Sequence, residues 1–544
     1  MWKQEYPRPQ LRRDRFLSLN GPWVVNNQTV EVPFPPQSAL SGWQGDVPDE
    51  LAYHRTFTLP EGFLNKGERL ILHFGAVDQI AEVFLNGHPI MRHEGGYLPF
   101  SADITAAVLG GENALTVLVT DTLNQDYPYG KQCKKPHGMW YTPVSGIWQS
   151  VWLEPVPQTY IRSLRITPAL DSITLNVDAD APDCQVDIPG VLVQTIPCGQ
   201  DVKLRIPQPH LWTVDDPYLY DLVITAGNDR VESYFALRTV EILPHGNTPA
   251  ICLNGTPVFL SGVLDQGYFP DGIFLPEDPA EFARDVQRMK ALGFNLLRKH
   301  IKIEPETFYF ACDRLGMLVM QDMVNNGPYT FFTDTALPTI GMKKRPDRFP
   351  WGKKRKEIFL RHSEDTIRHL YNHPCIVGYT IFNEGWGQFD SDQCYAVLKA
   401  LDPTRFWDAT SGWFIRHDSD LQSEHIYFRN TVLKSGGRPM LLSECGGFAR
   451  PMENHLSDKK QYGYGTAATE EALTDHIEQM HREMILPSIP HGLCGYIYTQ
   501  LSDVEGEING LYTYDRSECK VDVERMRKMA QGAERAFARR AQRK

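Results

Sequence analysis

Residues 277–298, EDPAEFARDVQRMKALGFNLLR, join a helical pattern to a short strand candidate. Apolar side chains recur at helical spacing up to Leu292, and Gly293 follows as a helix stop. Residues 294–298, FNLLR, then form a short and mostly apolar run. A helix that leads directly into a strand indicates an α/β domain in this part of the chain.

The same alternation continues toward the C-terminus. It yields eight strand candidates, at residues 257–263, 294–298, 316–321, 376–382, 405–409, 422–427, 439–443 and 493–499. Helices fit residues 277–292, 305–315, 355–371, 391–401, 470–485 and 520–540. Eight strands within about 290 residues predict one (β/α)8 barrel, with no clear helix between the fifth and sixth strands.

The first half of the chain has the pattern of β structure. Alternating or apolar runs occur at residues 69–74, 81–85 and 114–119. Asn86-Gly87 follows the second of them and is a strong hairpin signal. Such a region closes into a sandwich or a barrel.

A domain boundary falls near residues 154–157 (EPVP), just after the strand candidate at 146–153. Shorter strand candidates follow, among them residues 172–177 and 219–224. Residues 158–245 therefore suit a small immunoglobulin-like sandwich.

Composition excludes several classes of protein. The chain has 544 residues, of which 42% are hydrophobic and 22% charged, as in ordinary soluble domains. We find no apolar run of the roughly 18–20 residues that a membrane span needs. Charges and prolines near the N-terminus argue against an export signal. The net charge of −12 argues against a nucleic-acid partner.

The ten cysteines are scattered, and no two have CxxC spacing. A zinc site or a redox dithiol would need clustered ligands. We expect reduced and mostly buried thiols, as in a cytoplasmic protein.

Two glutamates follow strand candidates of the predicted barrel. Glu384 comes after residues 376–382 and Asn383, and Glu444 follows residues 439–443. The carboxyl ends of barrel strands form the face that carries active sites in this fold. Two carboxylates there suit glycoside hydrolysis, with one as acid and base and the other at the anomeric carbon. The alternative is that both glutamates cap helices or pair with arginines.

Ordered sequence blocks then make a family resemblance specific. They are residues 19–23 (LNGPW), 146–152 (GIWQSVW), 295–298 (NLLR), 312–317 (CDRLGM), 372–376 (NHPCI), 383–384 (NE) and 443–447 (SECGG). With these blocks the chain resembles glycoside hydrolase family 2, the β-galactosidase and β-glucuronidase family, over nearly its whole length. The resemblance implies a jelly-roll sugar-binding domain (1–157), an immunoglobulin-like β-sandwich (158–245) and a catalytic (β/α)8 TIM barrel (246–544).

The resemblance also implies roles for individual residues. Glu384 would be the general acid/base and Glu444 the nucleophile, whose block carries Cys445 where the family commonly has tyrosine. Asn383 would hold the sugar 2-hydroxyl, Arg298 would keep Glu444 ionised, and Tyr427 would contact the nucleophile. No organic cofactor and no metal site are implied.

Further side chains at or just past strand ends are candidates for substrate binding. Aromatic rings could stack on a sugar face, with core packing as the alternative: Trp386, Trp413, Tyr498 and Phe269. Polar groups could bind hydroxyls: Asp265, Gln266, His425, Asp503 and His300. His300 lies in the sequence Lys-His-Ile-Lys, where many family members have Ser-His-Tyr-Pro.

The loop at residues 504–512 bears on the identity of the sugar. β-Glucuronidases of the family carry an Asn-x-Lys pair late in the barrel, whereas Asn509 has no lysine two residues on. Glu505 and Glu507 would repel a uronate. We therefore predict a retaining exo-β-glycosidase for a neutral sugar, with a β-galactoside as the first choice.

Several alternatives stay open. The basic run at residues 343–356 (KKRPDRFPWGKKRK) is a reason to keep a β-glucuronide or β-galacturonide as substrate, although such runs are usually solvated loops. A non-catalytic carbohydrate-binding protein is the alternative from a different class. In each case the partner is a carbohydrate, and assembly into a homo-oligomer stays open.

Overall fold

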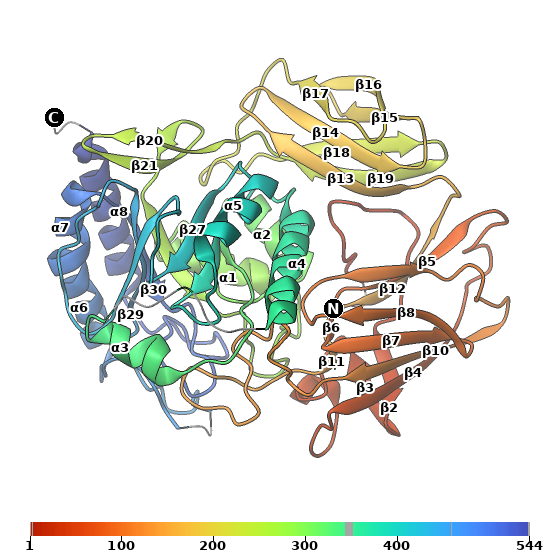
Figure 1. The fold of residues 1–544 in the computed structure, drawn as a ribbon, viewed down its shortest axis with the longest axis horizontal. Helices are drawn as coiled ribbons and strands as arrows, with labels where there is room; N and C mark the ends of the chain where they lie inside the picture. Colours follow the sequence, from red (N-terminus) through yellow and green to blue (C-terminus); the bar gives the residue numbers. More distant parts are fainter. Residues whose placement is uncertain (1, 3, 343–346, 348–351, 458–459, 542–544) are drawn as a thin grey trace.

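The computed structural model describes residues 2, 4–342, 347, 352–457 and 460–541. It contains two β-sandwiches and a (β/α)8 barrel, which confirms the predicted fold class. Figure 1 shows the barrel on the left, the N-terminal sandwich at the lower right and the second sandwich at the upper right. Most of the basic run at 343–356 lies outside the described residues.

Two sheets pack face to face in the N-terminal sandwich. The four-stranded sheet has the order β1-β12-β5-β9, and the six-stranded sheet has the order β3-β2-β4-β10-β7-β8. Their bounds are β1 Leu17–Ser18, β2 Gly21–Val25, β3 Gln28–Val32, β4 Glu50–Thr58, β5 Arg69–Phe74, β7 Ile80–Leu85, β8 His88–Glu94, β9 Phe100–Asp103, β10 Glu112–Thr120 and β12 Val151–Val156. Alternating apolar residues of both sheets form one core.

The predicted hairpin signal is confirmed. Asn86 and Gly87 connect β7 and β8, and Leu85 pairs with His88 across the turn. Both turn residues have positive φ, 53° and 79°, which a type I′ turn requires and which asparagine and glycine adopt readily.

The second sandwich has its own core. Its three-stranded sheet has the order β13-β14-β17, and its four-stranded sheet has the order β16-β15-β18-β19. The bounds are β13 Ile161–Pro168, β14 Ser172–Ala179, β15 Asp183–Ile188, β16 Leu192–Pro197, β17 Val202–Arg205, β18 Tyr220–Ala226 and β19 Asp229–Phe235. Isoleucine, leucine and valine side chains from both sheets fill the space between them. The three domain limits given above stay predictions.

The barrel contains all eight predicted strands. They are β23 Leu260–Asp265, β24 Leu296–Lys299, β25 Leu318–Asp322, β26 Ile376–Asn383, β27 Phe406–Ser411, β28 Gln422–Ile426, β29 Met440–Gly446 and β30 Leu493–Thr499. Neighbours pair in parallel in the order β27-β26-β25-β24-β23-β30-β29-β28. The paired strands carry almost continuous buried runs, as expected for parallel strands covered by helices.

The helices around the barrel also follow the prediction closely. They are α1 Glu281–Ala291, α2 Glu306–Leu315, α4 Lys353–Leu370, α5 Ser391–Leu401, α6 Glu470–Met480 and α8 Val523–Arg540. Residues 481–485, predicted as the end of α6, form one turn of π-helix instead. Residues 412–421, between β27 and β28, contain no helix, as the prediction for this crossover states.

A long loop of the N-terminal sandwich reaches the barrel. It runs from β10 to β11 (Gly146–Ile147), and its Tyr129 donates a backbone hydrogen bond to Asn325 and a hydroxyl hydrogen bond to Gly327. Asn325 and Gly327 follow strand β25, so the loop lies at the carboxyl end of the barrel. This face is therefore built by two parts of the chain.

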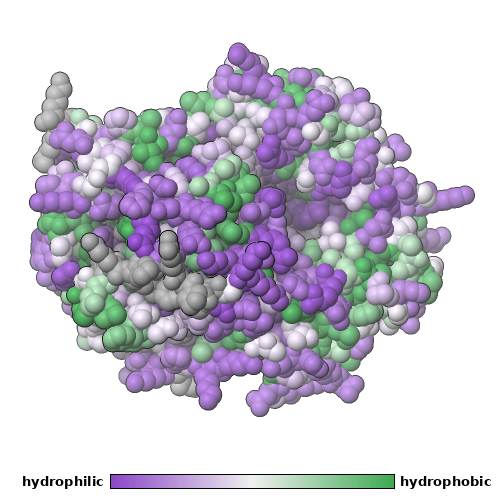
Figure 2. All heavy atoms as spheres, in the orientation of Figure 1, coloured by the Kyte–Doolittle hydropathy of each residue, from purple (hydrophilic) through white to green (hydrophobic). Residues whose placement is uncertain are grey.

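None of the helices in the described part of the chain combines the length and the apolar character of a membrane-spanning helix. Figure 2 shows that hydrophilic side chains cover most of the face seen in Figure 1.

Candidate active site

The two predicted carboxylates lie together at the carboxyl end of the barrel. Glu384 directly follows strand β26, and its backbone adopts a left-handed φ of 52°. This conformation is costly for a residue other than glycine, so the surroundings must hold it. Two hydrogen bonds do so: the Glu384 N–H donates to the Ser411 carbonyl, and the Trp413 indole donates to the Glu384 carbonyl at 3.0 Å.

Glu444 lies within strand β29, which continues to Gly446 and so extends beyond the predicted strand at 439–443. Its carboxylate accepts hydrogen bonds from Arg298 at 3.0 Å and from the Tyr427 hydroxyl. Burial would raise the pKa of the Glu444 carboxyl, but the neighbouring His425, Arg298 and His300 side chains and the Tyr427 hydrogen bond lower it to about 2. Glu444 is therefore ionised at neutral pH.

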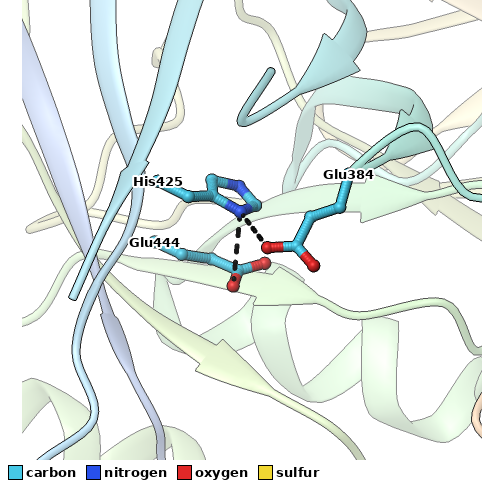
Figure 3. A group of neighbouring side chains, drawn as sticks. All are labelled: Glu384, His425 and Glu444. Carbon is cyan, nitrogen blue, oxygen red and sulfur yellow. Dashed lines mark hydrogen bonds and ion pairs between the residues drawn. The ribbon is translucent and has the colours of Figure 1, made fainter. Parts of the chain in front are cut away.

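His425, at the end of strand β28, lies between the two glutamates (Figure 3). Its Nδ1 is 2.8 Å from Oε1 of Glu384 and 3.5 Å from Oε2 of Glu444. One carboxylate oxygen of each glutamate and the imidazole nitrogen all lie within 4.8 Å of one another. The two carboxylates thus face one small space rather than separate faces of the barrel.

Arg298 connects several of the predicted residues. It is fully buried and donates hydrogen bonds to Glu444, to Asp322 at 3.0 Å and to the side-chain oxygen of Asn383 at 2.9 Å. Burial alone would lower the pKa of the guanidinium, but the charges of Asp322 and Glu444 raise it. The arginine therefore stays charged and fixes Asn383 beside the two glutamates.

His300 is held by the same group of acids. Its Nδ1 lies 2.7 Å from Asp322, which in turn accepts the Arg298 hydrogen bond. Burial and, after it, the positive charge of Lys131 lower the pKa of His300 to about 4, although the hydrogen bond with Asp322 acts in the opposite direction. A neutral imidazole is expected at this position.

The predicted aromatic residues differ in their surroundings. Trp413 contacts two residues of the site. Its indole N–H donates to the Glu384 carbonyl, and its ring meets the His425 ring edge-on, with ring centroids 5.4 Å apart. Trp386 packs against Trp140 of the N-terminal loop, with ring centroids 5.0 Å apart. Tyr498 is buried, and a side chain at Gly446 would collide with its ring.

Phe269 packs on Phe282 and Arg516, which fits core packing, and its stacking on a sugar stays a prediction.

Three predicted polar residues bind other protein groups. Asp265 accepts hydrogen bonds from Lys299 at 2.6 Å and from a backbone amide, and Asp503 accepts from Lys520 at 2.7 Å and from another amide. Gln266 donates to the Tyr141 hydroxyl at 2.9 Å. An aspartate that binds a lysine can serve the fold alone, without binding a sugar. The role of these three residues in sugar recognition therefore stays a prediction.

The sequence reasoning missed the residues that the N-terminal loop brings to the barrel. Tyr141 donates its hydroxyl hydrogen bond to Glu507, and the positive charge of Lys131 acts on Glu507 as well as on His300. No local motif marks these residues, because only the packing of two domains places them near strands more than 150 positions later.

Beside Trp386 the same loop lines an open cleft of about 820 Å³. Its aromatic walls come from the loop and from the barrel: Tyr129, Trp140, Tyr329, Phe331 and Tyr462. Tyr329 and Tyr462 are also close enough to Glu384 for its negative charge to help raise the pKa of both hydroxyls, after the larger effect of burial. The cleft therefore opens next to Glu384.

Tyr427→Phe tests the electrostatics of Glu444. Without the hydroxyl hydrogen bond the pKa of Glu444 rises, so the acidic limb of kcat/KM should move to higher pH. Loss of a hydrogen bond to a charged group costs about 1.5–3 kcal/mol, so kcat/KM should fall about 10- to 100-fold. The measurement is a pH–rate profile on an aryl glycoside.

The matched control is Tyr379→Phe on strand β26. Within the described residues its buried hydroxyl has no hydrogen-bond partner, so this variant should keep the wild-type profile. An unshifted acidic limb in Tyr427→Phe would show that the tyrosine does not act on Glu444.

Comparison with known proteins identifies the family. Three family models match in order: "Glycosyl hydrolases family 2, sugar binding domain" at residues 18–157, "Glycosyl hydrolases family 2" at 185–238 and "Glycosyl hydrolases family 2, TIM barrel domain" at 249–430. Together they cover more than half of the sequence. The chain therefore belongs to glycoside hydrolase family 2.

Its similarity to individual relatives is distant. The chain is 26% identical over 440 residues to a β-galactosidase of Thermoanaerobacter pseudethanolicus, which covers 75% of the chain and 54% of that relative. It is 26% identical over 470 residues to a β-glucuronidase of Rattus norvegicus, covering 78% of the chain and 67% of that relative. The chain spans about half the length of the β-galactosidase that it matches.

Solved structures share the fold. A β-D-glucuronidase of Dictyoglomus thermophilum matches with a TM-score of 0.77 and 19% identity, over 97% of the chain and 98% of that structure. A β-galacturonidase of Eisenbergiella tayi bound to galacturonate matches with a TM-score of 0.71 and 18% identity, over 98% and 99%.

Proposed function

We propose that the chain is a retaining exo-β-glycosidase that acts through a covalent glycosyl-enzyme. The observation that carries the proposal is the facing pair of carboxylates, with one oxygen of each within 4.8 Å of the other. Retaining glycosidases hold their carboxyl groups about 5–5.5 Å apart, whereas inverting enzymes leave about 6.5–9.5 Å for a water. The short separation supports retention over inversion.

The surroundings of the two glutamates support different roles for them. Glu444 is held ionised by Arg298 and Tyr427, as a nucleophile must be. Its oxygen would attack the anomeric carbon while Glu384 protonates the departing oxygen, which breaks the glycosidic bond. Glu384 would then take a proton from a water, whose oxygen displaces Glu444 and releases the sugar with its original configuration.

For the sugar, a neutral β-galactoside is the first candidate. Glu505 and Glu507 are buried in the loop after strand β30, and Glu507 is close enough to Glu444 for the charge of Glu444 to help raise its pKa, after burial. Two further carboxylates near the pocket disfavour an acidic sugar, because like charges repel strongly where water is excluded.

Lys131 favours a second candidate, a β-glucuronide or β-galacturonide. Its ammonium group acts on both His300 and Glu507, yet it forms no ion pair with any carboxylate among the described residues. A cation near His300 and Glu507 that lacks an ion-pair partner in the described part of the chain could bind the carboxylate of a uronic acid.

A panel of 4-nitrophenyl β-glycosides tests the proposal and separates the two candidates. The wild-type protein should hydrolyse the β-galactoside with a kcat/KM about tenfold or more above the β-glucuronide and β-galacturonide, a ratio that corresponds to about 1.4 kcal/mol of charge repulsion in the transition state. Absence of hydrolysis of every β-glycoside in the panel would contradict the proposed activity.

Lys131→Met extends the panel. If the sugar is neutral, this variant should retain its activity on the galactoside to within about threefold. A preference of the wild-type protein for a uronide, lost about 10- to 100-fold in Lys131→Met, would support the second candidate instead. Lys135→Met removes an exposed lysine of the same loop and is the matched control.

A further inference from the structure

The imidazole of His425 is held in one orientation between the two glutamates. Its side chain is fully buried, and a side chain at Gly412 would come within 2.7 Å of the ring, so the glycine provides the space for it. Trp413 closes the side of the ring with an edge-on contact. Each ring nitrogen therefore faces a fixed set of partners.

Two serine hydroxyls determine whether Nε2 of His425 or the Ser411 hydroxyl donates the hydrogen bond between them. Ser443 donates its hydroxyl hydrogen bond to the Glu424 carbonyl at 3.4 Å, and Ser411 donates to Ser443 at 2.9 Å. A hydroxyl has one proton to donate, so Ser411 must accept the third hydrogen bond of the chain. That bond is its 3.0 Å contact with Nε2 of His425, which therefore carries a proton.

The other nitrogen, Nδ1, faces only acceptors unless Glu384 carries a proton. Glu444 is ionised and already accepts from Arg298 and Tyr427. A lone pair on Nδ1 at 2.8 Å from an ionised Glu384 would be repulsive, because neither atom could donate. One proton must therefore lie between Nδ1 of His425 and Oε1 of Glu384.

We propose that His425 is a positioning residue that holds the general-acid proton on Glu384, rather than a ligand for a sugar hydroxyl. This inference rests on the proposed glycosidase function. His425 fixes the Glu384 carboxyl through this shared proton, which is available to the leaving group when the glycosidic bond breaks. The proton passes from Glu384 to the departing oxygen as the glycosidic bond breaks, and the attacking water later returns one to Glu384.

Other charged groups face this pair from the neighbouring strands. Arg298 on β24 binds Oε1 of Glu444, whereas His425 is near Oε2, and Arg298 also forms an ion pair with Asp322 on β25. Asp408 on β27 lies near Arg298 and His425, and burial raises the pKa of its carboxyl to about 6 against the opposite effect of these neighbours. Asp408 accepts a hydrogen bond from Ser423 at 3.0 Å, and its other carboxylate oxygen has no hydrogen-bond partner among the described residues, so Asp408 is not the partner of Nδ1.

His425→Asn tests the proposal through the leaving group. Loss of a positioned general acid slows substrates with poor leaving groups most, because activated phenolates depart without a proton. We expect kcat/KM on an alkyl glycoside to fall about 10- to 100-fold and on a 2,4-dinitrophenyl glycoside less than about threefold. Equal losses on both substrates would overturn the proposal, since a lost sugar contact weakens both transition states alike.

A double variant shows whether His425 acts through Glu384. In a Glu384→Ala background, His425→Asn should cause a much smaller loss on the alkyl glycoside than in the wild-type protein, because only its longer 3.5 Å contact with Glu444 is left. A full additional loss in the double variant would overturn the proposal. If the wild-type protein cleaves no glycoside, the proposed function fails instead, so the two failures are distinguishable.

The protonation state can also be read without activity. In the wild-type protein labelled with 15N-histidine, the resonances that disappear in His425→Asn should show a protonated Nε2 and a hydrogen-bonded Nδ1. A bare Nε2 would contradict the proton assignment. Thermal unfolding of each variant controls for misfolding, and Ser411→Ala should shift the same resonances while leaving Glu384 in place.

Discussion

Glu444→Ala is expected to abolish turnover on every glycoside that the wild-type protein cleaves. Without the carboxylate no covalent glycosyl-enzyme can form, so substrates with activated leaving groups are not turned over either. Removal of a nucleophile costs about 10⁴-fold or more in kcat, and kcat should fall by at least that much on alkyl and dinitrophenyl substrates alike. Initial rates on both substrates, with thermal unfolding to confirm folding, provide the measurement.

The structure indicates that this variant should fold. Arg298 retains Asp322 and Asn383 as partners when Glu444 is removed, so no buried charge is left alone. A folded Glu444→Ala variant that keeps more than about a tenth of the activity on an activated substrate would exclude Glu444 as the nucleophile.

Glu384→Ala is expected to produce a loss that depends on the leaving group. General acid catalysis contributes about 10²- to 10⁴-fold, so kcat/KM on an alkyl glycoside should fall by that factor. A dinitrophenyl substrate needs no proton in its first step and should retain much more of its kcat/KM. A series of aryl glycosides with leaving groups of different pKa measures this dependence as a slope.

The slope also provides the control for the assignment of roles. In Glu384→Ala it should be steeper than in the wild-type protein, whereas in Glu444→Ala no substrate should recover. If both variants lose activity equally on activated and unactivated substrates, the division of roles between Glu384 and Glu444 is wrong.

Local sequence patterns were sufficient for most of the barrel. Helices such as α1 and α5 repeat apolar residues with helical periodicity, and strands such as β26 are almost continuously apolar. Both types of element could therefore be predicted. Glu384 and Glu444 then followed from their positions at strand ends, because parallel strands bring their carboxyl ends to one face.

Contacts between distant segments could not be predicted in the same way. The position of His425 between two carboxylates depends on how strands β26, β28 and β29 are arranged around the barrel. This arrangement cannot be predicted from the spacing of residues in the sequence. Asp265 ends strand β23 and Asp503 comes shortly after β30, yet Lys299 and Lys520 bind them. Strand ends thus predict the face of the barrel and not the partner of each side chain.

Covalent trapping tests the central claim most directly. The protein is incubated with a 2-deoxy-2-fluoro aryl glycoside of the sugar that it cleaves, which slows release of the intermediate, and its peptides are analysed by mass spectrometry. The proposed mechanism predicts one added fluorosugar on Glu444. An adduct on Glu384, or an unlabelled protein that hydrolyses the parent glycoside with inversion, would contradict it.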